Sequence, residues 1–189
     1  MRWMQHSSLE GTHAFLSASS HSWLNYDDDK LVQSYYSYLA KIRGTELHAL
    51  AAEMIKHKVK CERSARTFNM YVNDAIGFKM DPEVLLYYSP FCYGTADTIK
   101  YEEKNHFLRI HDLKTGNIPA SMDQLLIYAA LFFLEYDIDA HKTDVELRIY
   151  QNDDISIFNP DIDEIIPVMD KIVTSNKVLE QLREEEDNE

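Results

Sequence analysis

The chain has few of the residues that define several classes of protein. Its 189 residues include two cysteines, Cys61 and Cys92, with five glycines and five prolines. Two thiols are too few for a disulfide scaffold, and an iron–sulfur cluster usually takes four. The scarcity of Gly and Pro excludes collagen-like and low-complexity chains. We therefore expect a folded protein with no iron–sulfur cluster, whose cysteines are ordinary reduced thiols.

Long hydrophobic runs are also missing. No apolar stretch approaches the roughly 20 residues that a membrane span requires. The longest one, Leu125–Leu134, is better explained as a buried helix. The beginning of the chain, Met1–Trp3, lacks the apolar core of a signal peptide. We therefore expect no membrane partner and a cytoplasmic, intracellular location.

Basic residues are outnumbered. There are 19 Lys and Arg against 32 Asp and Glu, for a net charge of −13. This balance disfavours nucleic-acid binding, because phosphates are neutralised by Lys and Arg. The acids are concentrated at 27–29 and in the tail at 183–189, whereas the balance reverses between Lys41 and Arg66. A local basic face is therefore compatible with this acidic chain.

The first half of the chain has apolar residues at helical spacing, which predicts helices there. The first covers Lys30–Ile42, and Gly44 then predicts an interruption or a close approach of another segment. A second helix is expected for the apolar stripe at 47–55, and a third over Ser64–Ile76.

From Val84 the composition changes to β-forming residues. Short polar breaks separate three runs, which predicts three strands in a meander. A Ser-x-x-Gln capping box at Ser121–Gln124 then opens an apolar helix that ends near Tyr136. An amphipathic helix is expected from Asp161 onward. The five expected strands are Val84–Tyr93, Thr95–Tyr101, Phe107–Leu113, Val145–Tyr150 and Ile155–Phe158.

This order of elements favours an α/β (α+β) fold with a mixed central β-sheet flanked by helices. The helix between the third and fourth strands is expected to cross over the sheet, because parallel neighbours need such a connection.

The segment Ile110–Gly116 carries the most informative pattern. Alternate side chains of a strand share a face, so Asp112 and Lys114 point the same way, roughly 7 Å apart. A carboxylate can hold Mg²⁺, and a lysine at this spacing can orient water or stabilise charge on a phosphate. Asp97 adds a second carboxylate from the preceding strand, and two converging acids call for a divalent cation. The three residues together predict a divalent-metal site beside a lysine that can act on water or a phosphate.

Three further residues flank this pattern. His48 lies beside an apolar helical stripe, where an imidazole would add tolerance of Mn²⁺. Gln124 and Tyr128 are four residues apart and share a helix face. Ordinary structural explanations stay open for all of these residues: a core histidine for His48, the capping box for Gln124, core packing for Tyr128, a turn cap for Asp97, and a surface ion pair for Asp112 with Lys114.

Taken in order, these residues resemble the RecB-like exonuclease branch of the PD-(D/E)xK nuclease superfamily. That branch reads G-x-x-x-H, G-x-x-D, D-x-K-T-G and Q-x-x-x-Y-A. Lambda-type exonucleases place Glu where His48 stands, so the RecB-like branch fits better. Many relatives carry four iron–sulfur cysteines, which this chain lacks. The matching segments, over about residues 43 to 130, are Gly44…His48, Gly94…Asp97, Asp112–Gly116 and Gln124…Ala129.

The resemblance implies a restriction-endonuclease-like core. The expected organisation is a single nuclease domain over 1–189, with an N-terminal helical extension (1–40), a catalytic core (41–160), and a C-terminal helix with an acidic tail (161–189). The implied cofactor is Mg²⁺ or Mn²⁺. Its implied ligands are His48, Asp97, Asp112 and the backbone carbonyl of Leu113.

The resemblance also implies roles and partners. Asp97 and Asp112 are expected to be catalytic, Lys114 to position the attacking water, and Gln124 and Tyr128 to support the site or the DNA. Small free-standing relatives are encoded by bacteriophages, which implies the host cytoplasm as the compartment. The candidate partners are single- or double-stranded DNA, a recombination or single-strand-annealing protein, and further copies of the chain in a homo-oligomer.

We therefore expect a metal-dependent deoxyribonuclease, with exonuclease action in DNA recombination, repair or processing. One alternative is a catalytically silent protein of the same fold that binds within a replication or defence complex. The net charge of −13 motivates it, whereas the presence of both acids and the lysine favours the enzyme. A hydrolase directed to RNA or nucleotides is a further alternative.

Overall fold

The structure is a computed structural model that describes residues 4, 7–9 and 11–187. It divides into two compact units, Met1–Thr45 and Glu46–Glu189. Met1–Trp3, on which the expected lack of a signal peptide depends, lie outside the described residues, as do the last two residues of the acidic tail. Within the described part, no helix is both long and apolar enough to span a bilayer.

The first unit combines short helical turns with the beginning of a long helix, α1 (Asp28–Lys56). Phe15 packs its ring against Tyr35 and Tyr38 of this helix, at centroid distances of 5.2 and 5.3 Å. Of the two outcomes expected at Gly44, an interruption is wrong, because α1 continues through it and joins the two helices expected over Lys30–Ile42 and 47–55 into one. A single glycine costs only about 1 kcal/mol in a helix interior, which a helix of 29 residues tolerates.

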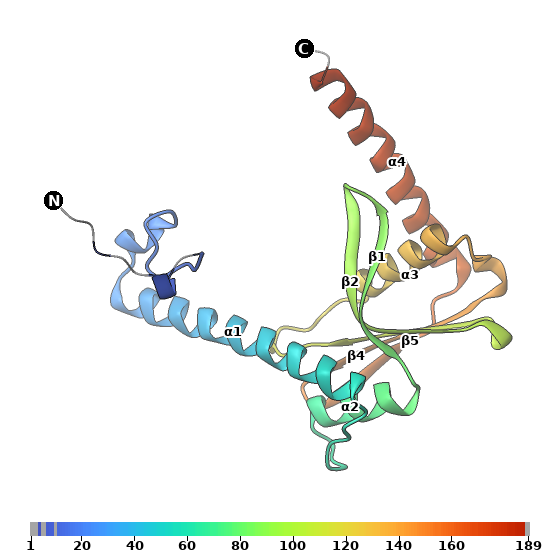
Figure 1. The fold of residues 1–189 in the computed structure, drawn as a ribbon, viewed down its shortest axis with the longest axis horizontal. Helices are drawn as coiled ribbons and strands as arrows, with labels where there is room; N and C mark the ends of the chain where they lie inside the picture. The colour runs from blue at the N-terminus through green and yellow to red at the C-terminus, as the bar shows by residue number, and fades with distance from the viewer. Residues whose placement is uncertain (1–3, 5–6, 10, 188–189) are drawn as a thin grey trace. The chain divides into compact units, whose positions relative to one another are not determined.

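The second unit contains a five-stranded mixed sheet, visible in Figure 1. The strands lie in chain order, and all neighbours are antiparallel except β3 and β4, which are parallel. The helix α3 (Asp123–Tyr136) makes the crossover between these two, as the sequence predicts. The strands are β1 (Asp81–Ser89), β2 (Cys92–Glu102), β3 (Phe107–Leu113), β4 (Asp144–Gln151) and β5 (Asp154–Phe158).

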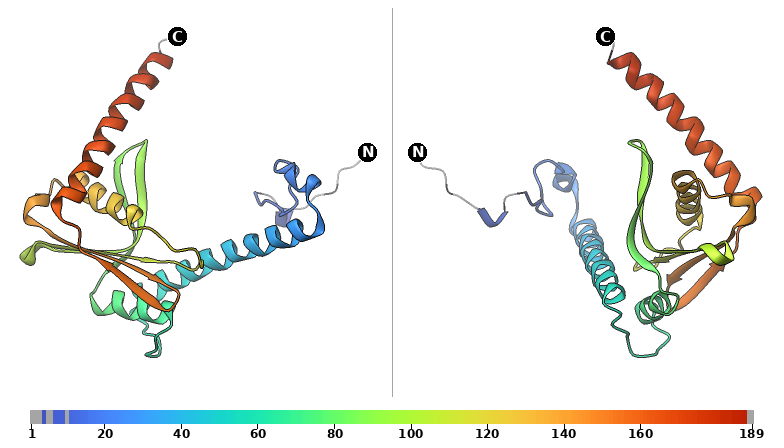
Figure 2. Two further views of the ribbon diagram at one scale, coloured as in Figure 1. Left: turned by 180° about the vertical axis from the view of Figure 1, so that it is seen from behind. Right: turned by 45° about the vertical axis from the view of Figure 1, so that its right-hand side comes forward.

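Helices pack on both faces of this sheet (Figure 2). On one face, α3 and α4 (Ile162–Glu186) form a core with Leu108 and Ile110 of β3. On the other face, α2 (Thr67–Gly77) and the end of α1 pack against Leu113 and Tyr150. Successive side chains of a strand point to opposite faces of the sheet, so neighbouring residues of a strand enter different cores. The end of β3 lies between the two cores, with buried side chains on both faces.

Two local expectations are wrong. The expected first strand, Val84–Tyr93, runs through a turn, because Ser89 pairs with Cys92 and β1 ends there. Pro90 occupies this turn, and proline has no N–H to donate to a ladder. The capping box at Ser121–Gln124 is not formed. Ser121 Oγ instead contacts Asp123 at 2.9 Å, and no side chain caps the first turn of α3.

The remaining expected elements are confirmed. The helix over Ser64–Ile76 corresponds to α2, and the strand Phe107–Leu113 has the bounds of β3. The helix expected from Asp161 is α4, and it begins with a capping box of its own. The Asp161 side chain accepts from the backbone of Glu164, and the Glu164 carboxylate accepts from the N–H of Asp161 at 2.9 Å.

Candidate active site

Three acidic residues stand in one row across three neighbouring strands. The β2–β3 ladder ends at the pair Thr98–His111, so Asp97 and Asp112 are the next residues on their strands. On the other side of β2, Pro82 faces Thr98 and Val84 faces Ala96, which places Glu83 opposite Asp97. Residues that face each other across strands have neighbouring side chains. Asp97 therefore stands between two other carboxylates.

Asp97 is held by the strand that it faces. Its Oδ2 accepts a hydrogen bond from the backbone N–H of Leu113 at 2.9 Å. The backbone hydrogen bonds between β2 and β3 end before this point. The Asp97 carboxylate therefore accepts from an N–H that would bond to a backbone carbonyl if the ladder continued. Leu113, whose carbonyl is an expected metal ligand, is itself buried. The alternative explanation of Asp97 as a turn cap after Gly94 is wrong, because Asp97 lies inside β2.

Asp112 and Lys114 form an ion pair at the end of β3. The Lys114 Nζ lies 2.8 Å from Oδ2 of Asp112 and donates to Oδ1 at 3.1 Å. The Asp112 side chain is 2% exposed and that of Lys114 28%, so this is not the surface ion pair that the bare motif would suggest. The backbone N–H of Lys114 donates to the Tyr150 carbonyl at 2.9 Å, which extends the alignment of β3 beside β4.

Gln124 and Tyr128 join this pair from α3. The Lys114 Nζ also donates to Oε1 of Gln124 at 2.8 Å, and Nε2 of Gln124 donates to the Tyr128 hydroxyl at 3.0 Å. A chain of hydrogen bonds thus runs from Asp112 to Tyr128. Because Gln124 makes these contacts and no capping box forms, the expected alternative role for Gln124 as a cap is wrong.

Gly94 makes room for the last member of that chain. A Cβ at Gly94 would lie 2.9 Å from Cε1 of Tyr128, closer than Cβ atoms approach other atoms. The glycine of one segment therefore accommodates the tyrosine of another, 34 positions later in the chain. The structure brings the G-x-x-D and Q-x-x-x-Y segments into direct contact.

His48 reaches the row of acids from α1. Its Nδ1 lies 3.3 Å from Oδ2 of Asp97, and its side chain is 30% exposed, which excludes a core histidine. The hydrogen bond with Asp97 raises the pKa of His48 above its usual value, with burial opposing and the charges of Asp112 and Glu83 adding to the effect. The imidazolium form is thus favoured while Asp97 is its partner. A metal ligand must instead be the neutral imidazole.

Glu83 is the site residue that sequence reasoning missed. It lies in β1 with a φ of +53°, a left-handed conformation that is unusual for any residue but glycine. Burial, followed by the charge of Asp97, raises the pKa of its carboxyl, and His48 opposes this rise. No motif marks Glu83, and the expected first strand began one residue after it. Glu83 is identified by the register between β1 and β2, and this register is known only once the fold is known.

Electrostatics at this row disfavour full ionisation. Burial, followed by the charge of Asp97, raises the pKa of Asp112 to about 6, although Lys114 and His48 lower it. The structure therefore contains a buried carboxylate that is costly to charge, next to a second acid. Ionisable groups with strongly shifted pKa values are concentrated at functional sites, because catalytic groups need pKa values that match their task.

The donor set suits a hard divalent cation in its chemistry. Carboxylates and a carbonyl are the ligands that Mg²⁺ and Mn²⁺ prefer, and one imidazole is compatible with Mn²⁺. Within residues 4, 7–9 and 11–187, however, no three His, Cys, Asp or Glu side chains converge on a point where they could hold an ion. The acids instead contact basic side chains of the protein, Asp97 with His48 and Asp112 with Lys114. Metal binding would require these pairs to rearrange.

Comparison of the chain with models of protein families, with curated proteins and with solved structures gives no match. A functional assignment therefore depends on the geometry of the site and on the motifs that meet there.

Proposed function

We propose that the chain is a metal-dependent nuclease that hydrolyses DNA phosphodiester bonds. We further propose that it is a small member of the RecB-like branch of the PD-(D/E)xK superfamily with a restriction-endonuclease-like core. One observation carries the proposal: four separate segments of the sequence meet through specific side-chain contacts. His48 reaches Asp97, Asp97 holds Leu113, and Lys114 bridges Asp112 and Gln124.

The proposed ligands are Asp97, Asp112, His48 and the Leu113 carbonyl, with Glu83 added from the row of acids. A bound Mg²⁺ or Mn²⁺ would polarise the phosphate and lower the pKa of a bound water. The protein supplies the remaining organisation. Gln124, which is itself bonded to Tyr128, holds the Lys114 ammonium in place, so that Lys114 can orient the attacking water and stabilise developing charge. Such positioning is effective because the donors are fixed before reaction.

The reaction is a hydrolysis and needs no co-reactant besides water. The water oxygen forms a bond to phosphorus, and the bond from phosphorus to the leaving sugar oxygen breaks. One proton leaves the attacking water, and the leaving oxygen takes up a proton. The products are a phosphate monoester and a sugar hydroxyl. An exonuclease would repeat this step from a DNA end.

A second candidate function is a silent binding protein of the same fold. It is favoured by the absence, within the described part of the chain, of a preformed group of three ligands, and by the net charge of −13. The two functions differ in one respect that can be measured: the silent protein leaves every nucleic acid intact in the presence of metal.

The decisive experiment is a time course on end-labelled linear DNA and covalently closed circular DNA, with Mg²⁺, Mn²⁺ or chelator. Wild type is compared with Asp112→Ala, Lys114→Ala and the surface control Lys104→Ala. We expect wild type and the control to degrade linear DNA with metal, and the two site variants to be inactive but folded. An RNA substrate tests the RNA-directed alternative. Intact DNA in every reaction, or full activity of a folded site variant, contradicts the proposal.

A further inference from the structure

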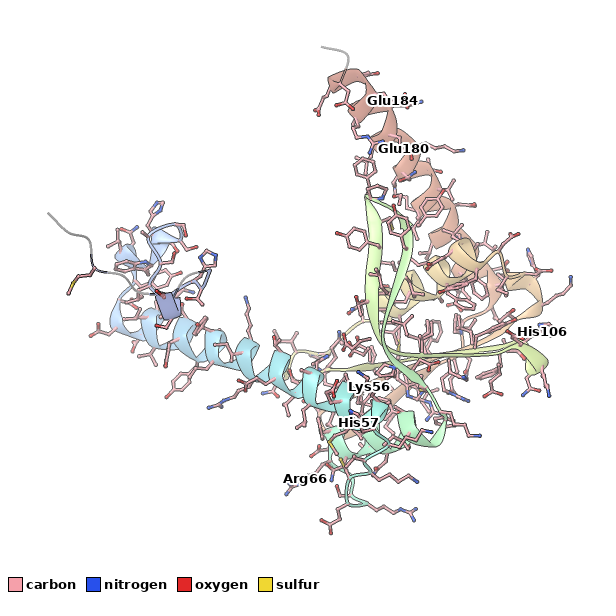
Figure 3. All side chains as sticks on the ribbon, in the orientation of Figure 1. Lys56, His57, Arg66, His106, Glu180 and Glu184 are labelled. Carbon is pink, nitrogen blue, oxygen red and sulfur yellow. The ribbon has the colours of Figure 1, made fainter. Side chains whose placement is uncertain are left out.

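The segment that links α1 to α2 concentrates positive charge on an acidic protein. We call residues 56–66 the basic segment. It carries five Lys and Arg residues and one acid, Glu62, so its net charge is +4 and that of all other residues is −17. Figure 3 labels Lys56 and Arg66 near its two ends, apart from Glu180 and Glu184 on α4. Its basic residues, all exposed, are Lys56, Lys58, Lys60, Arg63 and Arg66.

Most of this charge has no partner in the protein. Lys58, Lys60 and Arg63 make no ion pair with any residue in the described part of the chain. Lys56 lies 3.8 Å from Glu53, but both side chains are more than half exposed, and such pairs are weak. The charge is therefore available to a ligand, and a polyanion would find attraction here and repulsion over much of the remaining surface.

One of these lysines occupies an unfavourable backbone conformation. α1 ends in a Schellman motif, in which the Val59 N–H donates to the Met54 carbonyl at 2.8 Å and the Lys58 N–H to the Ile55 carbonyl at 3.1 Å. Lys58 is the left-handed residue of this motif, with a φ of +57°. Glycine is the usual residue at this position because it lacks the Cβ clash. A lysine there provides a charge at the expense of backbone strain.

The basic segment adjoins the candidate active site. It ends at Arg66, directly before the first residues of α2, Thr67 and Phe68. Both of these residues line a cleft of about 350 Å³ that Lys114 also lines. Asp153 is the acid in this cleft, but its Oδ1 already accepts from the Thr67 N–H at 2.8 Å and from the Thr67 hydroxyl at 3.1 Å. The cleft thus extends from Lys114 to the first residues of α2, which directly follow the basic segment, and its one carboxylate is already bonded.

We infer that the basic segment binds the phosphate backbone of the nucleic-acid strand whose scissile phosphate lies at Lys114. This inference rests on the proposed function, because it takes nucleic acid as the substrate. Lys and Arg that neutralise phosphates release counterions, which provides affinity without sequence preference. The acidic remainder of the surface would restrict the strand to this face. A chain of −13 net charge can then bind a polyanion through one local surface.

The chain offers a matched control for Lys58. α2 also ends in a Schellman motif, in which the left-handed residue is Lys79, with a φ of +57°. Lys79 is exposed as well, but it follows Phe78, which packs on Arg109 near the start of β3. It thus lies at the opposite end of α2 from Thr67. Lys58→Gly and Lys79→Gly each remove one positive charge and one left-handed Cβ, and they differ in position.

The test measures binding without cleavage. Fluorescence anisotropy of labelled single- and double-stranded oligonucleotides is recorded with the full chain in EDTA, over a series of salt concentrations. We expect Lys58→Gly to weaken binding by up to about eightfold at 0.1 M salt and to reduce the log–log salt slope by about 0.7 to 0.9. Adding Lys60→Ser and Arg63→Ser is expected to reduce the slope by roughly two to three in total. Lys79→Gly is expected to retain the wild-type slope, and neither glycine variant should melt earlier than wild type.

The outcomes separate this inference from the proposed function. Salt-dependent binding that is lost with Lys58, in a protein that never cleaves, supports the basic segment and contradicts the nuclease. Cleavage by Lys58→Gly with unchanged affinity and salt slope supports the nuclease and overturns the inference. Equal loss in the Lys58 and Lys79 variants also overturns it, because the effect would then be one of net charge. Absence of binding to either oligonucleotide at low salt also overturns it.

Discussion

The Lys114 ammonium lies 2.8 Å from Oδ2 of Asp112, and the two groups differ greatly in exposure, at 28% and 2%. The lysine is thus the accessible half of a pair whose other half is buried. Removing a partner from a buried pair costs about 3–5 kcal/mol when it leaves an uncompensated charge. We predict that Lys114→Met is destabilised at neutral pH and loses cleavage by about 10²-fold or more.

The double variant Lys114→Met/Asp112→Asn separates these two effects. It has no unpaired carboxylate, so its free energy of unfolding should recover while cleavage stays absent. Urea unfolding at pH 7 and the end-labelled assay measure the two quantities. A single Lys114→Met variant that is as stable as wild type would show that the pair contributes nothing to folding.

Asp112 itself should make the metal-free protein less stable at neutral pH. Its pKa is raised from 3.8 to about 6, so the folded state holds the proton more tightly than the unfolded state. Stability from this group is present below about pH 4, falls as the pH rises to about 6, and stays lower above that. At roughly 1.4 kcal/mol per pKa unit, the loss is up to about 3 kcal/mol.

We therefore predict that Asp112→Asn is more stable than wild type at pH 7 in EDTA and equally stable near pH 3.5. The exposed residue Asp170 provides the control, since Asp170→Asn removes one carboxylate from the surface instead of from a buried position. Chemical denaturation at several pH values measures the difference. A variant that loses activity while gaining stability would indicate a residue retained for function. An Asp112→Asn protein that is less stable than wild type at pH 7 contradicts the prediction.

Glu83 combines a ligand-type side chain with a strained backbone, and two substitutions distinguish these features. Glu83→Gln keeps the φ of +53° and removes the charge, whereas Glu83→Gly also relieves the left-handed Cβ. If the carboxylate contributes to metal binding, both variants should weaken Mn²⁺ binding to a similar degree, by about tenfold or more. Glu83→Gly should in addition be more stable without metal by up to about 1 kcal/mol.

Isothermal titration calorimetry with Mn²⁺ measures this affinity independently of cleavage. The increase in melting temperature on adding metal is a second readout, because a ligand that binds the folded state stabilises it. Asp170→Asn on α4 is again the control. Unchanged Mn²⁺ affinity in Glu83→Gln would remove Glu83 from the site and leave its conformation as a local feature of β1.

The sequence predicted the order of elements well because hydrophobic periodicity is a local property. The crossover helix between β3 and β4 and the bounds of β3 were both predicted correctly. The residues of the motifs also predicted which side chains meet around Lys114. The sequence did not reveal Glu83 or the approach of Gly94 to Tyr128, because both depend on pairing between strands and on packing of α3. Those relationships are fixed by register, which no single segment encodes.

The contact between Gly94 and Tyr128 gives the last prediction. No positive φ applies at Gly94, so the cost of adding a methyl group there is steric. Because a Cβ would lie 2.9 Å from Cε1 of the tyrosine, Gly94→Ala should displace the ring and destabilise the protein by about 1–3 kcal/mol. The displaced hydroxyl no longer accepts from Gln124, which in turn holds Lys114, so cleavage should fall as well.

Second substitutions at Tyr128 test that sequence of causes. Tyr128→Leu removes the ring edge that meets the new methyl group, so Gly94→Ala/Tyr128→Leu should regain stability without regaining activity. Tyr128→Phe alone keeps the ring and removes the hydroxyl, so it should fold normally and cleave more slowly. Gly77→Ala is the control, because nothing lies within 4 Å of a Cβ there. If Gly94→Ala is as stable as wild type, or if the leucine does not restore stability, the close contact does not limit packing. The proposed effect of Gly94 on Lys114 through Tyr128 and Gln124 would then be rejected.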